Sequence, residues 1–494
     1  MPNDLPGLSK NLRSVAYPMA TKQRLKLCSP TTARLLSAYG LGGATSRMYT
    51  VITLPDDLVI SHPSIVLVTG PSGSGKSQLI PLLANNIDAD QFDIGGALQS
   101  NLPIIELSTA PPKRALKTLA SVGLADAFSW VRCPAELSVG QRARLIIAIA
   151  IDSDARLIVI DEWLANLDRL TARAVAWSVG RALRKAGKSA IFVTAHDDLA
   201  HDLSPDLHIK VGWTPTPDIE VRRWSISEST VLGELTYARG DIKDWHALRH
   251  LHYAAGDPGT IHSIHALRHP DIDHPAAIAI CSYPDLHSAA RNIATDDRYR
   301  LKGAADSARK LNREVVKISR IVVTPELRGA GVASLLIESV KASISARYIE
   351  CVTPLGRHST FLARVGFREV PQTSGPAEAK LLDFAVRHRI PPSATIDADE
   401  LPTWADSQSV RVGRKLRRLA WLYYHHFVLH RRTRSAPPKR IPAATHPGWP
   451  ECWDLVARRI HERPAYYICG PIDPVTGVTD DATHTRAGGW LDLA

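Results

Sequence analysis

The chain has 494 residues, a net charge of +11, 45% hydrophobic residues and 22% charged residues. This length predicts about three domains of roughly 150 residues each, and the composition is typical of globular proteins with buried cores. No apolar run reaches the roughly 20 residues of a membrane span, which argues against an integral membrane segment. Six widely spaced cysteines without a Cys-x-x-Cys pair argue against a disulfide framework and favour a reducing, cytoplasmic location.

The first half of the chain has the pattern of an α/β domain. Residues 1–45 are predicted as an N-terminal lead-in, without the apolar core of a secretory signal. Within 46–215, three compact apolar strands are expected at 64–70, 155–162 and 189–196, and each ends where a polar motif begins. This arrangement predicts a mostly parallel sheet that binds its ligand at the carboxyl ends of the strands.

A phosphate-binding loop is predicted directly after the first of these strands. Residues 70–77 read Gly-Pro-Ser-Gly-Ser-Gly-Lys-Ser, which matches the pattern GxxxxGK[ST] between a strand and a helix. Glycines allow backbone N–H groups to surround phosphate oxygens, and the following helix N-terminus adds a positive dipole. Lys76 is expected to reach the β- and γ-phosphates, and Ser77 to ligate Mg²⁺. The glycines of the loop are Gly70, Gly73 and Gly75.

Two acidic residues end the second strand. The run 157–162 reads Leu-Ile-Val-Ile-Asp-Glu, which brings Asp161 and Glu162 to a strand end. Asp161 is expected to hold the magnesium shell, and Glu162 to polarise the water that attacks the γ-phosphate. The two motifs together predict ATP binding and hydrolysis.

Three further features narrow the class. Leu137-Ser-Val-Gly-Gln141 resembles the signature LSGGQ of ATP-binding cassette proteins, with Val139 in place of one glycine. Residues 165–168, Ala-Asn-Leu-Asp, resemble the D-loop of that family, and His196 resembles its switch histidine, which senses the γ-phosphate. The resemblance implies a head-to-tail homodimer in which one protomer completes the site around its partner's Lys76. The residues that the resemblance adds to the ATP site are Ser138, Gly140, Gln141 and Asp168.

The cassette departs from the transporter pattern. Only 62 positions separate Lys76 from Ser138, which is short for a cassette whose helical insert docks on membrane partners. This favours a cassette that drives conformational work over a transporter subunit, although a separate membrane partner stays open.

A second α/β domain is predicted over 225–390. Strands are expected at 276–283, 315–323 and 347–354, with an amphipathic helix over 332–344. Residues 328–333, Arg-Gly-Ala-Gly-Val-Ala, follow the second of these strands and resemble the pyrophosphate loop [Q/R]xxGx[G/A] of the GCN5-related acetyltransferases.

That resemblance implies binding of acetyl-CoA or a related acyl-CoA, because small residues and helix amides can cradle its diphosphate. Residues 361–367, Phe-Leu-Ala-Arg-Val-Gly-Phe, resemble the later FYxKxGF segment of the same family. A plain glycine turn between strand and helix is the alternative. The residues expected at the acyl-CoA site are Val322, Val323, Arg328, Gly329, Ala330, Gly331, Val332 and Ala333.

The catalytic group of this second domain is less defined by the sequence. Where many acetyltransferases carry a tyrosine general acid, this chain has Leu362. His358 is the leading candidate for acid–base catalysis because histidine titrates near neutral pH. Glu350, Tyr253 and Tyr283 are the alternatives.

The order of the domains resembles a family described as ATP-binding cassette ATPases fused to a predicted acetyltransferase domain. This implies an α/β architecture: a P-loop cassette at 46–215, an acetyltransferase-like domain at 225–390 and a basic C-terminal region at 400–494. The resemblance supplies no substrate.

The positive charge is concentrated in the C-terminal region. Residues 411–440 hold ten Lys/Arg and no acid, so the remainder of the chain is near neutrality. Over 411–434 the bases alternate with Trp421, Tyr423, Tyr424 and Phe427, a pattern that suits phosphate neutralisation and base stacking in DNA or RNA. The alternatives are a helix with core aromatics and a solvated basic face, or an anionic membrane surface.

The leading functional prediction is therefore an ATP-dependent acyltransferase that acts on a nucleic acid. ATP hydrolysis would open the substrate, because a base within a duplex is inaccessible until it is extruded. Two alternatives remain: a small-molecule or protein N-acetyltransferase gated by nucleotide state, and an ATPase whose second domain only senses acetyl-CoA.

Overall fold

The computed structural model describes most of the chain in two compact units. The first comprises residues 1–255, 266–278 and 322–336, and the second comprises 256–265, 279–321 and 337–494. The described residues are 12–18, 29–38, 48–55, 58–87, 89–214, 217–221, 229–253, 256–300, 305–371, 374–396, 399–429, 440–460 and 464–471.

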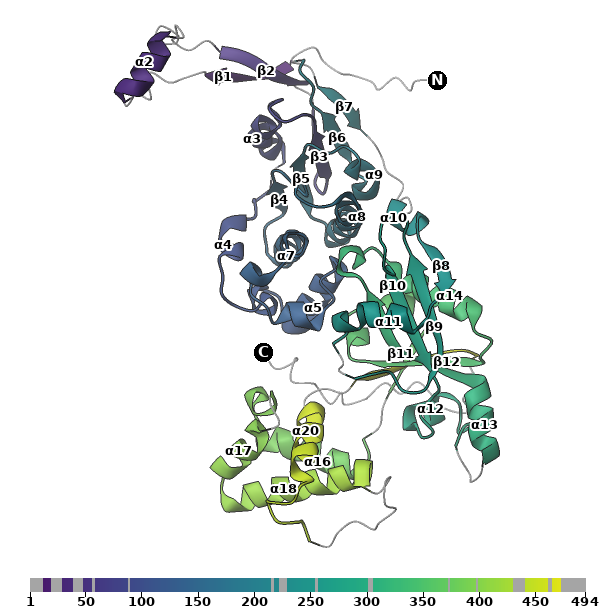
Figure 1. Cartoon of the computed structure of the whole chain (residues 1–494). Coiled ribbons are helices and arrows are strands. Elements are labelled where there is room, and N and C mark those ends of the chain that lie inside the picture. The colour runs from purple at the N-terminus through teal and green to yellow at the C-terminus, as the bar shows by residue number, and fades with distance from the viewer. Residues whose placement is uncertain are drawn as a thin grey trace. The chain divides into compact units, whose positions relative to one another are not determined.

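A five-stranded sheet forms the centre of the first unit, in the order β4-β5-β3-β6-β7 (Figure 1). The first four strands are mutually parallel, and β7 is antiparallel to β6. The predicted mostly parallel sheet is therefore confirmed. Its strands are β3 (Ile65–Thr69), β4 (Leu157–Ile160), β5 (Ser189–Thr194), β6 (Leu207–Lys210) and β7 (Asp218–Val221). A separate two-stranded antiparallel sheet pairs β1 (Leu12–Pro18) with β2 (Met48–Pro55).

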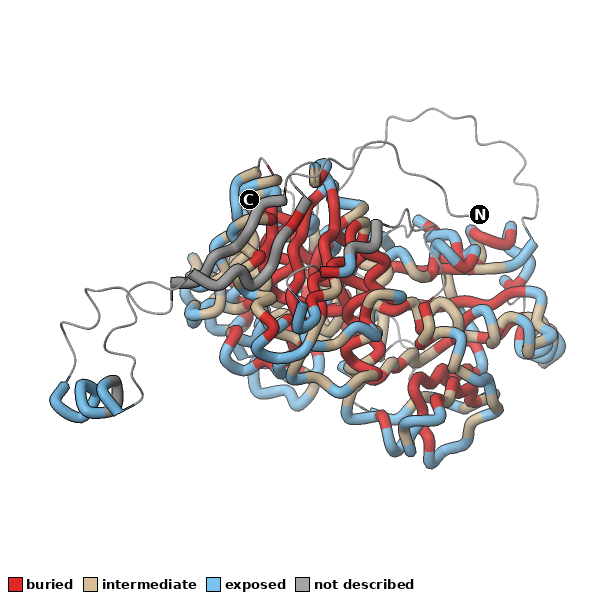
Figure 2. Tube along the Cα trace, turned by 90° about the horizontal axis from the view of Figure 1, so that it is seen from above, coloured by how far each residue is buried: buried red, intermediate tan, exposed pale blue. Residues whose placement is uncertain are grey.

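Both faces of the central strands β3, β4 and β5 are buried, which explains why these three strands are mostly apolar. Ile65 and Leu67 of β3 belong to one core, whereas Val66 and Val68 belong to the core on the opposite face. This alternation follows from the two-residue period of a strand. Figure 2 shows the buried segments of the chain in red.

The helices of the first unit cover these two faces. The core that contains Ile65 and Leu67 is completed by residues of α5, α7, α8 and α9, and the opposite core by residues of α3. The helices are α3 (Lys76–Asn86), α4 (Ile94–Leu98), α5 (Pro112–Ser121), α6 (Ala127–Trp130), α7 (Val139–Asp152), α8 (Arg169–Ala186), α9 (Leu199–Leu203), α10 (Thr230–Gly233) and α11 (Ile242–Leu248).

A seven-stranded sheet has the order β13-β14-β12-β11-β10-β9-β8. Strands β8 to β11 are neighbours in chain order, and the predicted strands at 276–283, 315–323 and 347–354 are found as β10, β11 and β12. The strands are β8 (Thr236–Arg239), β9 (Ile261–Arg268), β10 (Ala277–Ser282), β11 (Val315–Val323), β12 (Tyr348–Thr353), β13 (Arg368–Val370) and β14 (Ala465–Cys469).

Both parallel and antiparallel pairs occur in this sheet. Strand β11 runs parallel to β12, whereas β12 and β13 are each antiparallel to β14. The parallel connection requires a crossover, which α14 (Val332–Ser343) supplies. Pairing of β11 with β12 ends at Ile318 and Cys351, although β11 continues to Val323. The second half of β11 is therefore not paired with β12.

The last strand of the sheet comes from far along the chain. Between β13 and β14 lie the helices α16 (Pro376–Arg387), α17 (Glu400–Ser407), α18 (Val410–Tyr424) and α20 (Trp449–Ile460), which share a core of their own. The predicted boundary near 390–400 falls inside this helical insertion, and β14 returns to the sheet from within the predicted C-terminal region. The remaining helices are α12 (Ala289–Ala294), α13 (Ala305–Glu314) and α15 (Phe361–Arg364).

A buried ion pair joins β12 to α12 in the second unit. The Arg291 guanidinium donates to both carboxylate oxygens of Glu350 at 2.8 Å, and the Tyr466 hydroxyl donates to the same carboxylate at 2.6 Å. Arg291 and Glu350 are 0% and 1% exposed, so the carboxylate is fully engaged and sealed from solvent. This geometry favours a structural role for Glu350 over the alternative role as catalytic base.

Replacing Arg291 with alanine is expected to destabilise the second unit by about 3–5 kcal/mol, because it leaves the buried Glu350 carboxylate without a cation. The urea midpoint of unfolding, followed by circular dichroism, measures this loss. Arg300→Ala is the matched control: its ion pair with Asp297 is exposed, so its loss costs less than about 1 kcal/mol. Equal shifts for the two variants would contradict a stabilising role for the buried pair.

Candidate nucleotide-binding and acyl-donor sites

The predicted phosphate loop lies between β3 and α3, and its backbone requires glycine. Gly70, Gly73 and Gly75 have φ angles of 148°, 80° and 91°, which favour glycine. A Cβ on Gly70 would lie 2.0 Å from the Val211 carbonyl oxygen. The φ angles therefore favour glycine at all three positions, and at Gly70 a side chain would also collide with the backbone. The Lys76 ammonium donates to the carbonyls of Gly70 and Pro71 at 2.8 Å, so it lies over the loop.

The two acids predicted to act with this loop follow β4. The Glu162 N–H donates to the Asp161 carboxylate at 2.9 Å, and Glu162 has a left-handed φ of 52°. The next residue anchors the turn: the Trp163 N–H donates to the Val193 carbonyl at 2.8 Å, and its ring stacks on Phe192. Both carboxylates are exposed at the carboxyl edge of the sheet.

The charges of these two acids act on Lys76 of the phosphate loop. Burial lowers the pKa of Lys76, and the negative charges of Asp161 and Glu162 act in the opposite direction. The three predicted residues therefore share one edge of the sheet. Ser77 follows Lys76 in the first turn of α3, with an exposed side chain. A hydroxyl and a carboxylate at this edge are oxygen ligands of the kind that Mg²⁺ prefers.

The signature-like motif forms the start of α7. Ser138 is the N-cap: its hydroxyl accepts from the Gln141 N–H at 3.3 Å, and the Gln141 side chain accepts from the Ser138 N–H at 3.0 Å. This reciprocal capping box explains the serine and the glutamine without a ligand. Gly140 lies in ordinary contact with Leu167 and Thr171, 3.6 Å from where a Cβ would be.

The D-loop-like segment leads into α8. Asp168 caps this helix by accepting from the Thr171 N–H at 2.8 Å. His196 follows β5 at the same carboxyl edge, and its N–H donates to the Thr194 hydroxyl at 3.4 Å. The fold thus brings every residue predicted for the ATP site into the first unit.

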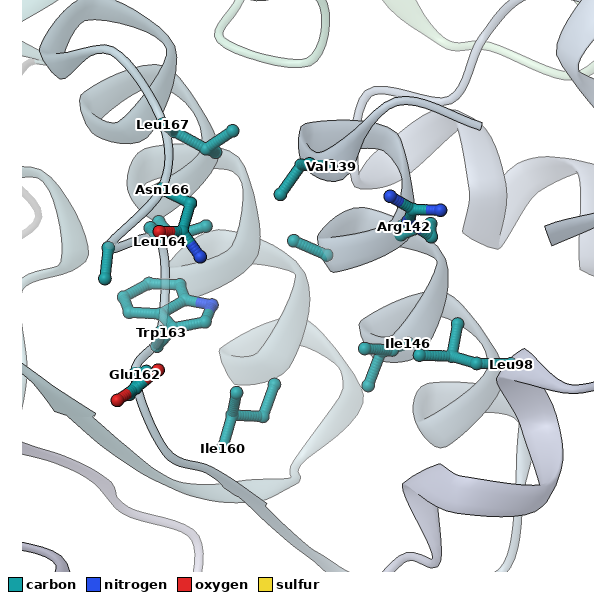
Figure 3. A pocket seen from close by; sticks show the side chains of 12 residues that line it. Leu98, Val139, Arg142, Ile146, Ile160, Glu162, Trp163, Leu164, Asn166 and Leu167 are labelled. Atoms are coloured by element: carbon teal, nitrogen blue, oxygen red, sulfur yellow. The ribbon is translucent and has the colours of Figure 1, made fainter. Parts of the chain in front are cut away.

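A pocket of about 190 Å³ separates α7 from the segment that follows β4 (Figure 3). Val139 and Ile146 of α7 face Leu164 and Leu167 across it, and Glu162 lies at its edge. The lining is mostly apolar. The pocket thus leaves a gap along part of the contact between α7 and the segment that carries Glu162.

The predicted acyl-donor loop lies between β11 and α14. Val322, Ala330 and Val332 are buried, whereas Val323, Gly331 and Ala333 are half-buried. Gly331 has a φ of 105°, and α14 begins at the next residue. First-turn amides of a helix have no intrahelical acceptor, which is the property that an anion site uses.

The side of this loop that faces the cassette is closely packed. Gly329 has a φ of 87°, and a Cβ there would lie 2.7 Å from the Gly123 Cα. Arg328 forms an ion pair with Asp126 at 3.1 Å and donates to the Val323 carbonyl. Arg328, at a specified position of the sequence pattern, and Gly329, at an unspecified one, therefore each have a packing reason to be there. The cassette residues Asp126, Arg144 and Trp177, which contact this loop, were not found by sequence reasoning, since no motif marks them.

The candidate acid–base residues of the second domain are scattered. His358 is 7% exposed and ends a short 3-10 turn, η6 (Leu355–Arg357), after β12. Tyr283 and Tyr253 are exposed, at 42% and 36%. Leu362 is buried, so no proton-donating side chain stands where the resemblance implies a tyrosine. His358 stays a prediction.

One trio of side chains among the described residues is close enough to hold a metal: Glu234, His269 and Asp271. Both ring nitrogens of His269 already have hydrogen-bond partners: Nδ1 accepts from the Asp271 N–H at 3.1 Å, and Nε2 lies 2.8 Å from Glu234. Arg173 also donates to both Glu234 oxygens, which lowers the pKa of that carboxyl. The trio is an ion-pair network.

The aromatic residues of the basic segment do not lie where the prediction of base stacking requires them. Trp421, Tyr423 and Tyr424 are 3%, 1% and 2% exposed and belong to the core of the helical insertion, so they present no face to a base. They follow Gly413 and Leu416 on the buried face of α18. The alternative, a helix with core aromatics and a solvated basic face, describes α18 better. Residues 430–439 of the predicted segment lie outside the described residues.

The opposite face of α18 carries exposed bases. Positions i, i+3, i+4 and i+7 lie on one side of a helix. Arg417 is paired with Asp406 and Lys415 lies over the Phe384 ring, but Arg411, Arg414 and Arg418 are exposed. We call Arg411, Arg414, Lys415 and Arg418 the α18 stripe. Within the described parts of the chain, no helix combines the length and apolar character needed to cross a bilayer.

Comparison with curated proteins finds similarity to transport ATPases over part of the chain. The chain is 34% identical over 169 residues to the aliphatic sulfonates import ATP-binding protein SsuB of Pseudomonas putida, covering 28% of this chain and 60% of that protein. It is 33% identical over 191 residues to the protein of the same name from Burkholderia pseudomallei, covering 32% and 57%. The chain thus spans about 60% of the length of these relatives.

No protein-family model matches the chain. Among solved structures, a dimeric post-hydrolysis state of the ATP-binding cassette MJ0796 bound to ADP and Pi is 20% identical, with a TM-score of 0.29, covering 36% of this chain and 94% of that chain. A second dimeric structure of MJ0796, a bacterial ABC transporter cassette, is 19% identical with a TM-score of 0.28.

Proposed function

We propose that this chain, which carries an ATP-binding cassette domain, hydrolyses ATP and couples hydrolysis to the transfer of an acyl group from acyl-CoA to a nucleic acid. The observation that carries the proposal is the combination, within one compact unit, of a phosphate loop after β3 and a second glycine-bearing loop between β11 and α14. Each loop lies between a strand and a helix N-terminus, the place where anions bind.

Hydrolysis follows from the groups at the carboxyl edge of the first sheet. Lys76 and the amides of the phosphate loop would bind the β- and γ-phosphates. Mg²⁺ held by Ser77 and Asp161 would neutralise developing charge on the phosphates. Glu162 would take a proton from the attacking water, and His196 would contact the γ-phosphate.

The proposed active form is a homodimer through the cassette domains. Ser138 and Asp168 are exposed at the N-caps of α7 and α8. In the first turn of α7, Gly140 is buried and Gln141 is half-buried. In a head-to-tail pair these residues would face the partner's phosphate loop. The capping box at Ser138 uses the Gln141 N–H, so the Val139 and Gly140 amides are the first-turn donors of α7 that remain for an anion.

Transfer requires an acceptor nucleophile and a leaving thiolate. An amine nitrogen attacks the thioester carbonyl, the C–S bond breaks, the acceptor loses a proton, and the CoA thiolate gains one. The loop of residues 328–333 would hold the diphosphate of the donor, and His358 would move the proton. If His358 does not act, the buried Leu362 supports a second candidate function, in which the domain senses acetyl-CoA without turnover.

The α18 stripe supports a polyanionic acceptor. Reversing Arg411, Arg414 and Arg418 to glutamate is expected to weaken binding of DNA or RNA at least tenfold at physiological salt. It should also flatten the dependence of affinity on salt, since fewer counterions are released. Fluorescence anisotropy with labelled oligonucleotides measures both.

The control is the same three-charge reversal on α13, which leaves the stripe intact. Unchanged affinity and salt slope in the α18 variant would remove this surface as the docking site. The reversed control residues are Arg309, Lys310 and Arg313.

The function is tested first by the ATPase rate with acetyl-CoA present, with and without DNA and RNA, at two salt concentrations. Salt-sensitive stimulation by one polymer is expected, and it identifies the acceptor class. A rate unchanged by either polymer would contradict the nucleic-acid acceptor and favour a small molecule or protein.

A further inference from the structure

The acyl-donor loop is supported from behind by cassette residues. We call Gly123, Asp126, Arg144 and Trp177 the backing residues; they come from the segment between α5 and α6, from α7 and from α8. All of them, and loop residues 322–333, belong to the same compact unit. Helix α8 also packs against η5 (Pro325–Leu327), the 3-10 turn that begins the loop.

Two of the backing residues, Arg144 and Trp177, donate hydrogen bonds to carbonyls of the loop. Arg144 donates to the carbonyls of Pro325 and Glu326 at 3.0 and 2.9 Å. The Trp177 indole N–H donates to the Ala330 carbonyl at 3.1 Å. In a trans peptide the carbonyl of one residue and the N–H of the next point in opposite directions. Trp177 therefore turns the Gly331 N–H away from the cassette.

This orientation is what an anion site on the far side of the loop requires. The amides of Gly331, Val332 and Ala333 precede or begin the helix, so they lack helical acceptors, whereas the Ser334 N–H already donates to the Gly331 carbonyl at 3.0 Å. Rotation of the Ala330–Gly331 peptide plane would replace the donor with a carbonyl, which repels phosphate. The hydrogen bond from Trp177 of α8 thus determines whether the loop presents the Gly331 N–H or the Ala330 carbonyl to an anion.

Arg144 adds charge to the same place. It is 2% exposed, bonds to carbonyl oxygens, and forms no ion pair with any carboxylate among the described residues. Burial, followed by the charge of Arg328, lowers the pKa of Arg144 to about 10, so it still carries a proton at neutral pH. Its charge adds to that of Arg328 beside the loop, and the nearby Glu326 carboxylate offsets part of it.

The helices that carry Arg144 and Trp177 begin at the two motifs proposed to contact the partner's nucleotide, the signature-like motif for α7 and the D-loop-like motif for α8. Arg144 lies on α7 three residues after Gln141, and Trp177 lies on α8 nine residues after Asp168. The pocket of about 190 Å³ between α7 and the segment after β4 gives α7 space to shift when nucleotide binds. Helix displacements of about 1–2 Å are typical of such switches and are enough to break a hydrogen bond.

We propose that Arg144 and Trp177 are positioning residues that set the conformation of the acyl-donor loop according to the nucleotide bound by the cassette. This inference rests on the proposed acyl-CoA site. Because coupling between two binding sites is reciprocal, ATP must change the affinity for acyl-CoA by the same factor as acyl-CoA changes the affinity for ATP.

The test uses the full chain with Glu162→Gln, so that ATP persists. Isothermal titration gives the Kd of acetyl-CoA with and without saturating Mg²⁺–ATP, and the Kd of ATP with and without acetyl-CoA. We expect both ratios to be equal and to fall in the range of about 5- to 150-fold. Trp177→Phe should bring both ratios to within twofold of unity. The Kd of ATP measured without acetyl-CoA should not change in this variant. Arg144→Lys, which keeps the charge and one donor, should give an intermediate ratio.

Trp245→Phe is the matched control. Trp245 is also a buried tryptophan of the first unit, but its indole N–H has no hydrogen-bond partner among the described residues. This variant loses the same atoms and should keep the full ratio. Acetyl-CoA binding that ATP does not change, or a ratio that survives both Trp177→Phe and Arg144→Lys, would overturn the inference. No acetyl-CoA binding in any form would instead overturn the proposed acyl-CoA site, and the inference with it.

Discussion

Glu162→Gln is expected to lower ATP turnover by about 10²- to 10⁴-fold and to leave ATP bound, because glutamine keeps the shape of the side chain but cannot accept a proton. The backbone at Glu162 is held by the stacked Trp163 and the hydrogen bond to Val193, so the substitution should not move the turn. Phosphate release measures turnover, and titration with a fluorescent ATP analogue measures binding.

Two comparisons sharpen this prediction. Lys76→Ala should lose binding as well as turnover, since it removes the cation over the phosphate loop. Glu106→Gln, at an exposed glutamate of the same unit, should change neither. With ATP, the Glu162→Gln protein should also form a stable dimer in light scattering. A monomeric ATP-bound form would contradict the composite site at Ser138 and Gly140.

Ala333→Glu is expected to weaken acetyl-CoA binding by more than tenfold. The second residue of α14 is half-buried beside the proposed diphosphate cradle, and a carboxylate there repels phosphate. An acid in the first helical turn favours the helix itself, so loss of binding would not come from loss of α14. Equilibrium titration of acetyl-CoA measures the affinity.

Ala333→Gln separates charge from size, because glutamine has nearly the same volume as glutamate and no charge. It should retain most of the affinity. The difference between the two variants should shrink at high salt as the repulsion is screened. Equal affinity of Ala333→Glu and the unsubstituted protein would remove this loop as the diphosphate site.

The cassette could be predicted well from its sequence because its chemistry is local. The strand before Gly70, the strand before Asp161 and the strand before His196 are short apolar runs whose ends carry the functional residues. Parallel strands bring such ends to one edge, so the site followed from the order of motifs.

The backing residues could not be predicted because their roles depend on contacts distant in sequence. Arg144 looks like any basic residue in a helix, yet its partners are carbonyls more than 180 positions away. Gly123 has a φ of 95° and lies against the backbone of Arg328, a requirement visible only when the two segments meet. Strand β14 was missed for the same reason, since the helical insertion separates it from β13.

The basic segment shows how one pattern can support two structures. Bases alternating with aromatics suit both a nucleic-acid surface and an amphipathic helix with an aromatic core. The spacing of Gly413, Leu416, Ala420 and Tyr424 follows the helical period and decides between them once α18 has a core to pack on. What remains of the nucleic-acid prediction is the α18 stripe.

The central claim, that one chain couples ATP hydrolysis to acyl transfer, is tested most directly by labelled transfer. The intact protein is incubated with [¹⁴C]acetyl-CoA, Mg²⁺–ATP and either DNA or RNA, and label in the purified polymer is counted. The account predicts incorporation into one polymer that requires ATP and is lost in Glu162→Gln and in Ala333→Glu. Rapid ATP hydrolysis without label in either polymer would contradict it.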